Sequence, residues 1–445
     1  MKGAARLVAV VWVTLAVAYG LFFSFSIFFV PLIQEFRWSR ALTAGAMSLS
    51  SIVQGVGAPL AGVLADRFGP RAMITAGVVM LAAASMLAAT IQAPWQLYLY
   101  TGVLGALGLV AIGWVPMGLL ISRWFQARRG RMAGMAFSGM GFGVFVIGPL
   151  TQWLIATTTW RTASLILGLA TLVLLLPLVL WAIRDTPPPT DVPSQGGKVR
   201  RNDVQDVENR HVIDVAPTTR VADAGAAGAS RASGVSSEEA PAAPASARRD
   251  ADATLSDALR SRAFWFLFAA YFCTPLAVFP VAIHAVAFAV DHGYPPMLAA
   301  TAYGSMGLMS TVGRAGFGVL ADRLGGPLAA TLSFGCTAGG AAALLALEAV
   351  PGVGWLVVFA LLFGLGFGAR GPIITAIASE WFGGRRFGVI YGVLNLGNGL
   401  AGAIGPWFGG VVHDVSGSYR LAFMASIVFS ACGSACFWLA HRRSP

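Results

Sequence analysis

The sequence contains 445 residues, of which 57% are hydrophobic and only 11% are charged. Soluble globular domains carry about 25% charged residues, so this composition excludes an ordinary water-soluble protein. The formal net charge of +11 is compatible with an acidic or nucleic-acid partner only if the basic residues gather on one surface, and their distribution argues against that.

Apolar segments long enough to cross a bilayer follow one another along the chain. A spanning helix needs about 20 mostly apolar residues. Segments of this kind occur near residues 7–33, 41–61, 72–93, 96–121, 130–156, 162–183, 263–290, 298–320, 327–349, 354–378, 387–412 and 419–440. The first is too long for a signal-peptide core and lacks a small-residue cleavage site, so we expect it to remain as the first helix. The sequence therefore predicts an all-α polytopic membrane protein with twelve transmembrane helices.

The basic residues predict the orientation of these helices. With a cytoplasmic N-terminus, 24 of the 30 Lys and Arg residues fall in cytoplasmic segments. Only Arg37, Arg40, Arg161 and Arg420 fall on the opposite side. The positive-inside rule then places both termini in the cytoplasm. We expect the membrane to be a bacterial-type inner membrane. The net charge orients the chain and predicts no nucleic-acid partner.

The composition changes abruptly between Arg184 and Leu259. This stretch opens with "DTPPPTDVPSQGG", is rich in Ala, Ser, Pro, Asp and Arg, and shows no apolar periodicity. Such a segment buries too little apolar surface to offset its ordering entropy. We expect residues 184–259 to form a disordered cytoplasmic linker between an N-terminal six-helix bundle (1–183) and a C-terminal six-helix bundle (260–445).

The two halves repeat each other. "GVLADR" occurs at residues 62–67 and again at 318–323, an offset of 256. The stretch that begins at Arg123 and runs into the fifth segment resembles the one that begins at Glu380, and "TTWRTAS" before the sixth segment resembles "GSYRLAF" before the twelfth. A nearly constant offset predicts two parallel, pseudo-symmetric bundles, an arrangement known from secondary transporters with a midplane site.

The loop after the second segment, "GVLADRFGPR", resembles the G-x-x-x-D-R-x-G-R-[RK] motif of the major facilitator superfamily. It departs from the motif at Pro70, and the second copy lacks the terminal base. Asp66 can sit near a helix N-terminus and pair with a base of the same half, although a solvated loop that only sets topology is the alternative. We predict a cytoplasmic gate formed by Asp66, Arg67, Arg71, Asp322, Arg323, Arg128 and Arg129.

Two stretches narrow the resemblance further. "RWFQARRGRMAGMAFSGMGFG" is similar to the fifth-helix motif of monocarboxylate porters, and "GSMGLMSTVGRAGFGVLADR" is similar to the eighth-helix pattern of those porters and of bacterial oxalate–formate exchangers. The chain lacks the acidic start of helix 1 found in animal porters, and Ser310 stands where they carry aspartate. Bacterial relatives therefore match better, and the resemblance implies that Arg314 grips a substrate carboxylate.

Two arginines lie within predicted helices. Arg314 is about 12 Å and Arg370 about 15 Å from the cytoplasmic helix ends at 1.5 Å per residue. Charges at such depth normally face a cavity and mark a pathway. No Asp or Glu lies deep in a predicted span, and a guanidinium fork matches a carboxylate. We predict an anion site, with capping of backbone carbonyls as the alternative, above all for Arg370 beside the bend at "GARGP".

Other polar residues within the helices complete the predicted site. We expect a polar lining of Tyr19, Gln54, Trp114, Tyr391, Asn395 and Asn398, although Asn residues also join helices to one another. His284 is a candidate for proton coupling because imidazole titrates near neutral pH. A packed, hydrogen-bonded histidine is the alternative.

The favoured function is secondary transport of a small organic anion by alternating access, coupled to protons or working by exchange. One arginine suits a monocarboxylate such as lactate or pyruvate, and two suit a dicarboxylate such as oxalate. A drug exporter of the same fold and a transport-dead sensor are weaker alternatives. An intramembrane hydrolase has little support, because Ser138 and His284 lack a third activating group.

We expect no cofactor and no metal site. The four cysteines, Cys273, Cys336, Cys432 and Cys436, lie in apolar segments without metal-binding spacing, which is typical of packing residues. No ATP-binding motif accompanies the helices, so ion or solute gradients would supply the energy. We expect a monomer.

Overall fold

The computed structural model describes residues 2–125, 129–183, 255–382, 384 and 387–442. Within these residues every regular element is a helix, and no β-strand occurs. Most of the predicted linker lies outside the described residues. Its last five residues belong to helix α12 (Leu255–Arg260), which is held to the bundle because Ala258 is buried and the Trp265 indole donates to the Leu259 carbonyl. The predicted boundary at residue 260 coincides with the end of this short helix.

The N-terminal bundle is built from six membrane-length stretches, several of them interrupted. They are α1 (Lys2–Phe23) with α2 (Phe25–Phe36), α3 (Arg40–Phe68), α4 (Pro70–Ala88), α5 (Pro94–Leu97) with the π-helix η1 (Tyr98–Gly105), α6 (Ala106–Ile112) and α7 (Trp114–Trp124), α8 (Arg129–Phe137) with α9 (Gly139–Thr157), and α10 (Trp160–Ala182).

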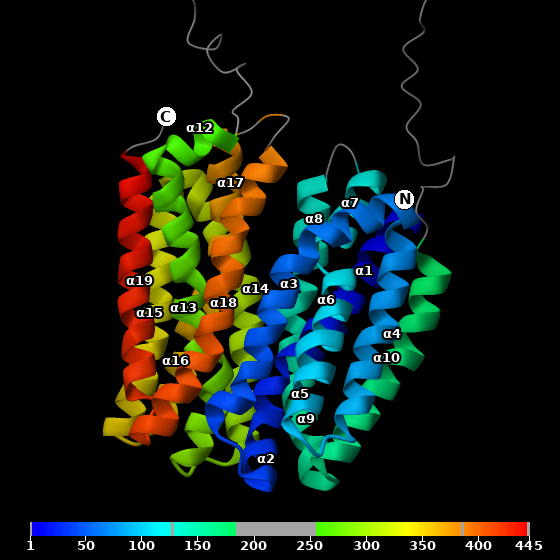
Figure 1. The fold of residues 1–445 in the computed structure, drawn as a ribbon, viewed down its shortest axis with the longest axis vertical. Helices are drawn as coiled ribbons and strands as arrows, with labels where there is room; N and C mark the ends of the chain where they lie inside the picture. The colour runs from blue at the N-terminus through cyan, green and yellow to red at the C-terminus, as the bar shows by residue number, and fades with distance from the viewer. Residues whose placement is uncertain (1, 126–128, 184–254, 383, 385–386, 443–445) are drawn as a thin grey trace, which may run out of the picture. The chain divides into compact units, whose positions relative to one another are not determined.

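The C-terminal bundle repeats this order. Its helices are α13 (Arg262–Asp291), α14 (Pro296–Leu324), α15 (Gly326–Ala349), α16 (Val353–Gly366) with α17 (Arg370–Phe382), α18 (Phe387–Ser416) and α19 (Arg420–His441). Figure 1 shows the two bundles side by side, the first in blue to green and the second in green to red.

All twelve predicted segments are helical where the structure describes them, and eleven stretches are both long and apolar enough to cross a membrane. The eighth, α14, is 29 residues long but is not among the eleven. Its sequence explains the difference, because it carries Arg314 together with many Gly, Ser and Thr residues. Of the twelve helical stretches, the one that is not apolar enough to count as a span is thus the one that bears the predicted substrate arginine.

The repeat is visible in the backbone at the "GVLADR" copies. Gly69 ends α3 with φ 84° and ψ 151°, and Gly325 ends α14 with φ 88° and ψ 152°. Only glycine adopts this conformation readily, so each bundle makes the same turn at the same place. Helix α4 then starts at Pro70 and α15 at Gly326, again 256 residues apart.

One helix interruption falls at an equivalent place in both bundles, and two others occur in the N-terminal bundle alone. The fourth stretch breaks at Gly113, between α6 and α7, and the tenth breaks at Phe367–Ala369, where Gly368 has φ 79°. The first and fifth stretches break at Ser24 and Ser138. Breaks leave backbone groups without helical partners, and in membrane proteins such backbone lines a buried or water-filled site. The breaks at Gly113, Ser138 and Gly368 all lie close to Arg314.

The two bundles meet along α3 with α18 and along α9 with α14. We name two faces of this assembly. The terminal face carries Phe68 and His441, the ends of α3 and α19, and the distal face carries Arg40, Asp291 and Tyr419. In Figure 1 the terminal face is at the top and the distal face at the bottom. The hydrogen bonds between the bundles run from the distal face to the level of Arg314.

Candidate functional site

Arg314 projects from α14 at the boundary between the bundles and meets only neutral partners. Its Nη2 donates to the Ser310 hydroxyl at 3.0 Å, its Nε donates to the Ser310 carbonyl at 3.3 Å, and its Nη1 lies 3.5 Å from Sδ of Met140 on α9. The side chain is partly exposed. No carboxylate forms an ion pair with Arg314 within the described ranges, so its guanidinium retains capacity for an anion.

Small residues bring α9 close enough to hold this arginine between the bundles. A Cβ atom on Gly141 would lie 2.3 Å from the Gly307 carbonyl oxygen, and one on Gly143 would lie on the Ala16 carbonyl. Nearby, the Thr311 hydroxyl donates to the Ser138 carbonyl at 3.0 Å. The glycine-rich motif of the fifth stretch thus permits close packing against α1 on one side and α14 on the other.

Two predicted lining residues lie beside Arg314. The Tyr19 hydroxyl is 3.5 Å from where a Cβ of Gly113 would stand, at the break before α7. The Tyr19 side chain also lies near those of Trp114 and Arg314. Trp114 is 47% exposed and packs on Phe137 with ring centroids 4.5 Å apart. Helices from both bundles therefore supply a phenol, an indole and a guanidinium to one place.

An aromatic pair that sequence reasoning missed lies next to this group. Phe23 from α1 and Phe367 from the break after α16 meet edge to face, with centroids 5.7 Å apart. Phe367 directly precedes Gly368, whose Cβ position is 3.4 Å from Nε of Arg314, and Phe23 lies 6.4 Å from the Tyr19 ring. The sequence signal that could have indicated this pair is Gly368, because the helix is interrupted there and Phe367 lies directly before the interruption.

Arg370 is placed differently from Arg314. It is completely buried in the C-terminal bundle, where Nη1 donates to the Thr337 hydroxyl at 3.0 Å and the guanidinium lies 4.3 Å from the centroid of the Phe334 ring. Its Nε and Nη2 have no hydrogen-bond partner within the described residues. Both named contacts belong to α15, so in this structure Arg370 points into its own bundle.

The remaining predicted lining residues do not contact Arg314. The Gln54 amide donates to the Ser50 hydroxyl at 3.1 Å, and the Tyr391 hydroxyl lies 2.8 Å from that of Thr375 and 3.4 Å from that of Tyr271. Asn395 and Asn398 are half-buried on α18 and make no hydrogen bond among the described residues. Gly55 and Gly399 are in contact, so Gln54 and Asn398 lie near the α3–α18 crossing.

His284 is completely buried at the junction of the bundles. Its Nε2 lies 2.9 Å from the Pro406 carbonyl, which can only accept, so Nε2 carries a proton. The ring packs edge-on to Phe29 of the other bundle at 5.1 Å and on Tyr419 at 4.9 Å. Nδ1 has no partner within the described part of the chain. The alternative of a packed, hydrogen-bonded histidine matches this arrangement.

The predicted gate is partly described. Arg123, which the prediction omitted, lies 3.8 Å from Asp66, and Arg71 donates to the Leu180 carbonyl at 2.6 Å. The Arg67 guanidinium covers the Phe68 ring at 5.3 Å. Asp322 and Arg323 are exposed at the end of α14. Arg128 and the side chain of Arg129 lie outside what the structure describes.

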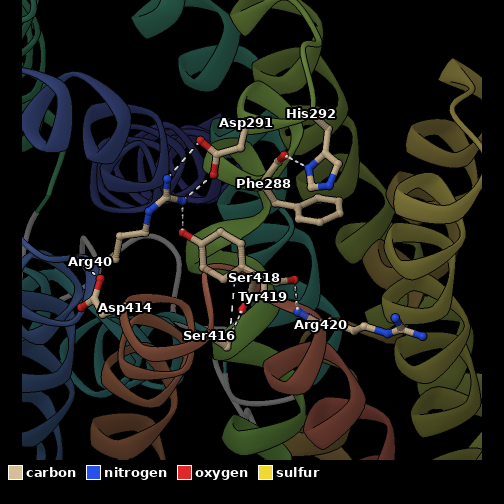
Figure 2. Close-up of polar contacts among 9 residues, drawn as sticks. All are labelled: Arg40, Phe288, Asp291, His292, Asp414, Ser416, Ser418, Tyr419 and Arg420. Atoms are coloured by element: carbon tan, nitrogen blue, oxygen red, sulfur yellow. Dashed lines mark hydrogen bonds and ion pairs between the residues drawn. The ribbon is translucent and has the colours of Figure 1, made fainter.

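The distal face holds a polar contact between the bundles that the sequence did not reveal (Figure 2). Arg40, at the start of α3, pairs with Asp291 at 2.5 and 3.0 Å and donates to the Tyr419 hydroxyl at 2.6 Å. The Asp414 carboxylate accepts from the backbone amides of Arg40 and Ala41 at 2.9 and 2.8 Å. It therefore caps the N-terminus of a helix in the other bundle.

Comparison with known proteins agrees with this architecture. The family model of the Major Facilitator Superfamily matches residues 11–369 and 329–445. The chain belongs to this superfamily. Superfamily membership confirms the predicted fold and makes the protein a transmembrane transporter by family.

Individual relatives show which members of the superfamily the chain resembles. The chain is 25% identical over 419 residues to monocarboxylate transporter 13 of Bos taurus, covering 94% of this chain and 85% of the relative. It is 27% identical over 417 residues to monocarboxylate transporter 12 of Homo sapiens, covering 91% and 75%. It is also 27% identical over 414 residues to monocarboxylate transporter 3 of Rattus norvegicus, covering 91% and 73%. The predicted resemblance to monocarboxylate porters is thus confirmed over most of the chain.

Proposed function

We propose that the protein is a secondary active transporter that moves a small organic anion, a monocarboxylate such as lactate or pyruvate, across a bacterial-type inner membrane. The terminal face would lie in the cytoplasm, as the distribution of Lys and Arg favours. Arg314 would bind the carboxylate, with Tyr19 and Trp114 beside it. The names of the relatives support the substrate class.

The surroundings of Arg314 carry this proposal. A guanidinium within the membrane is costly unless it is paired or hydrated. Its partners are one hydroxyl, one carbonyl and one thioether, all neutral. A carboxylate that accepts two hydrogen bonds from the guanidinium would supply the missing charge, because such pairs are stronger than neutral hydrogen bonds.

A monocarboxylate is favoured over a dicarboxylate by the position of Arg370. A second carboxylate would need a second cation close to Arg314. Arg370 instead hydrogen-bonds Thr337 and lies over Phe334 inside the C-terminal bundle. In this conformation the Arg314 guanidinium lies at the boundary between the bundles and that of Arg370 does not, which suits a substrate with one carboxylate.

The contacts between the bundles support alternating access. On the distal side, Arg40 and Asp291 join the bundles, and the Ser26 hydroxyl donates to the Ile283 carbonyl at 2.9 Å. On the terminal side of Arg314, the ion pair of Arg123 with Asp66 and the hydrogen bond from Arg71 to the Leu180 carbonyl both lie within the N-terminal bundle. This pattern is the one expected when the site communicates with the cytoplasm and the distal face is shut.

Coupling to protons would need a titratable group at the boundary between the bundles. His284 remains our candidate because Nδ1 has no hydrogen-bond partner among the described residues and the ring touches both bundles. Exchange of one carboxylate for another needs no such group. His284→Gln keeps a hydrogen-bond donor to the Pro406 carbonyl, so proton-driven uptake lost in this variant, with exchange retained, would assign the coupling to His284.

The test is uptake of labelled monocarboxylates and dicarboxylates into proteoliposomes, for wild type and Arg314→Gln, with and without an inward proton gradient. We expect saturable uptake of a monocarboxylate by wild type and none by the variant, with both proteins eluting as one folded species. Wild-type uptake that survives the substitution would contradict the site. A failure of every carboxylate to cross would contradict the substrate class.

A further inference from the structure

The two bundles use equivalent acidic residues in different ways at the distal face. In the N-terminal bundle Glu35, at the end of α2, accepts from the Trp160 indole and from Arg161, each at 2.5 Å. Both partners begin α10 of the same bundle. Arg161 also donates to the Ile91 carbonyl and lies over the Trp160 ring. All contacts of this cluster therefore lie within the N-terminal bundle.

The equivalent residues of the C-terminal bundle do not pair with one another. By the sequence repeat, Asp291 corresponds to Glu35, Tyr419 to Trp160 and Arg420 to Arg161. Yet Asp291 pairs with Arg40 of the opposite bundle. Figure 2 shows Arg420 directed away from Asp291. The Arg420 side chain is exposed and makes no ion pair among the described residues.

Arg40 has no counterpart in the repeat. The residue 256 positions later is Pro296, at the start of α14. The bond from Arg40 to Asp291 therefore has no equivalent in the N-terminal bundle. It joins the two bundles, whereas the repeat predicts a bond from Asp291 to Arg420 within the C-terminal bundle. Its partners are also partly buried, with 16% and 35% of the two side chains exposed.

We propose that Asp291 is a switch with two partners. It pairs with Arg40 while the distal face is closed, and it pairs with Arg420 of its own bundle when the face opens, as Glu35 does with Arg161. This inference rests on the alternating access proposed above. Arg420, whose side chain makes no ion pair among the described residues here, is then the residue that stabilises the conformation with an open distal face.

The physical advantage of such an exchange is that the acid stays paired in both states. Opening the distal face without a second partner would give up the charge-assisted pair with Arg40, and a second arginine would offset that loss. The groups around the exchange are Asp414, which caps α3, His413, which packs on Tyr419, and Glu348, which accepts from the Ser418 hydroxyl at 3.4 Å. Glu348 is the competing acid for Arg420.

The test measures the opening of the distal face directly and needs no substrate. Spin labels are attached to Gln92→Cys and Val350→Cys, two exposed positions in the equivalent loops of the two bundles. The four native cysteines are replaced, and the distance distribution is recorded by pulsed electron resonance. We expect Arg40→Gln to raise the ratio of long to short distances at least about fivefold.

The decisive comparison is made in the Arg40→Gln background. Adding Arg420→Gln should return the ratio toward the wild-type value, because Asp291 then lacks a partner in the open state as well. Adding Arg161→Gln is the matched control and should leave the ratio unchanged, because Arg161 pairs within its bundle in both states. A ratio unaffected by Arg420→Gln, or by Arg40→Gln itself, would overturn the switch.

This result is separable from the proposed substrate. The distances report the conformation whether or not a carboxylate is carried. Absence of carboxylate uptake together with the expected changes in distance would contradict the function and support the switch. Normal uptake with unchanged distances would do the reverse.

Discussion

Arg314 and Arg370 are the two arginines that lie deep within the helices of the C-terminal bundle, and their surroundings are opposite in character. Arg314 is partly exposed at the boundary between the bundles and contacts Met140 across it. Arg370 is completely buried within one bundle, with Thr337 as its one hydrogen-bond partner among the described residues. The backbone break at Gly368 separates them, since it adjoins Arg314 and is followed two residues later by Arg370.

The difference teaches that the depth of a charge in the membrane and the direction it faces are separate properties. Depth follows from the sequence by counting residues at 1.5 Å each. Direction depends on how the chain leaves the break at Gly368, where the helical periodicity is lost. A cation facing the boundary can meet a solute, whereas one enclosed by its own bundle must rely on a hydroxyl and an aromatic ring.

The largest contrast is expected from removing each charge with the same substitution. Arg314→Met should lower kcat/KM for carboxylate uptake about 100-fold, because charge-assisted hydrogen bonds to the substrate are lost. Arg370→Met should keep uptake within about twofold of wild type, because the guanidinium contacts Thr337 and Phe334 inside the C-terminal bundle. Proteoliposome uptake measures both. The result that would reverse our comparison is an uptake loss in Arg370→Met with the fold and melting temperature intact.

Much of the fold could be predicted from the sequence because the lipid environment leaves few choices. Unpaired backbone groups are excluded from the hydrocarbon region, so long apolar segments must be helices. The repeat of "GVLADR" then predicted two related bundles, and Gly69 and Gly325 adopt nearly the same φ and ψ. The interruptions at Gly113 and Ser138 were not predicted, because irregular backbone depends on contacts between helices rather than on local propensity.

The candidate site was predicted less completely. Tyr19 lies near Arg314, whereas Tyr391 bonds to Thr375, and the role of each residue in binding stays a prediction. Polarity alone marks a residue for the interior without saying which face of the helix it occupies. The distal contact of Arg40 with Asp291 was missed because the two residues are separated by 251 positions and the repeat offers no model for Arg40.

Replacing Gly368, which adjoins Arg314 and precedes Arg370 by two residues, should change the positions of both arginine side chains. Gly368 has φ 79°, and an alanine there costs about 1–2 kcal/mol from the left-handed backbone alone. The added Cβ would also stand 3.4 Å from Nε of Arg314. We expect Gly368→Ala to lower both the melting temperature and uptake. Gly371→Ala, where nothing lies within 4 Å, is the matched control and should lower neither. Equal behaviour of the two variants would mean that the break carries no strain.

The partner of Arg370 offers a test that affects stability more than transport. Thr337→Val keeps the side-chain volume but removes the hydroxyl that accepts from Nη1. An unsatisfied buried donor costs about 1–3 kcal/mol, so the melting temperature should fall while KM for the carboxylate stays unchanged. Thermal unfolding in detergent and uptake kinetics check the two parts. A raised KM at constant melting temperature would assign Thr337 and Arg370 to the substrate path after all.

The smallest expected effect belongs to Tyr19 and tests how closely the site is built around Arg314. Tyr19→Phe keeps the ring beside Trp114 and removes only the hydroxyl near the guanidinium. We expect KM to rise about three- to tenfold with kcat little changed, which is the signature of losing one hydrogen bond that binds ground state and transition state alike. Tyr391→Phe is the matched control, because its hydroxyl bonds to Thr375 and should leave KM unaltered. If Tyr19→Phe and Tyr391→Phe raise KM equally, the solute path extends along α18 as well. The site then includes Asn395 and Asn398, as the sequence predicted.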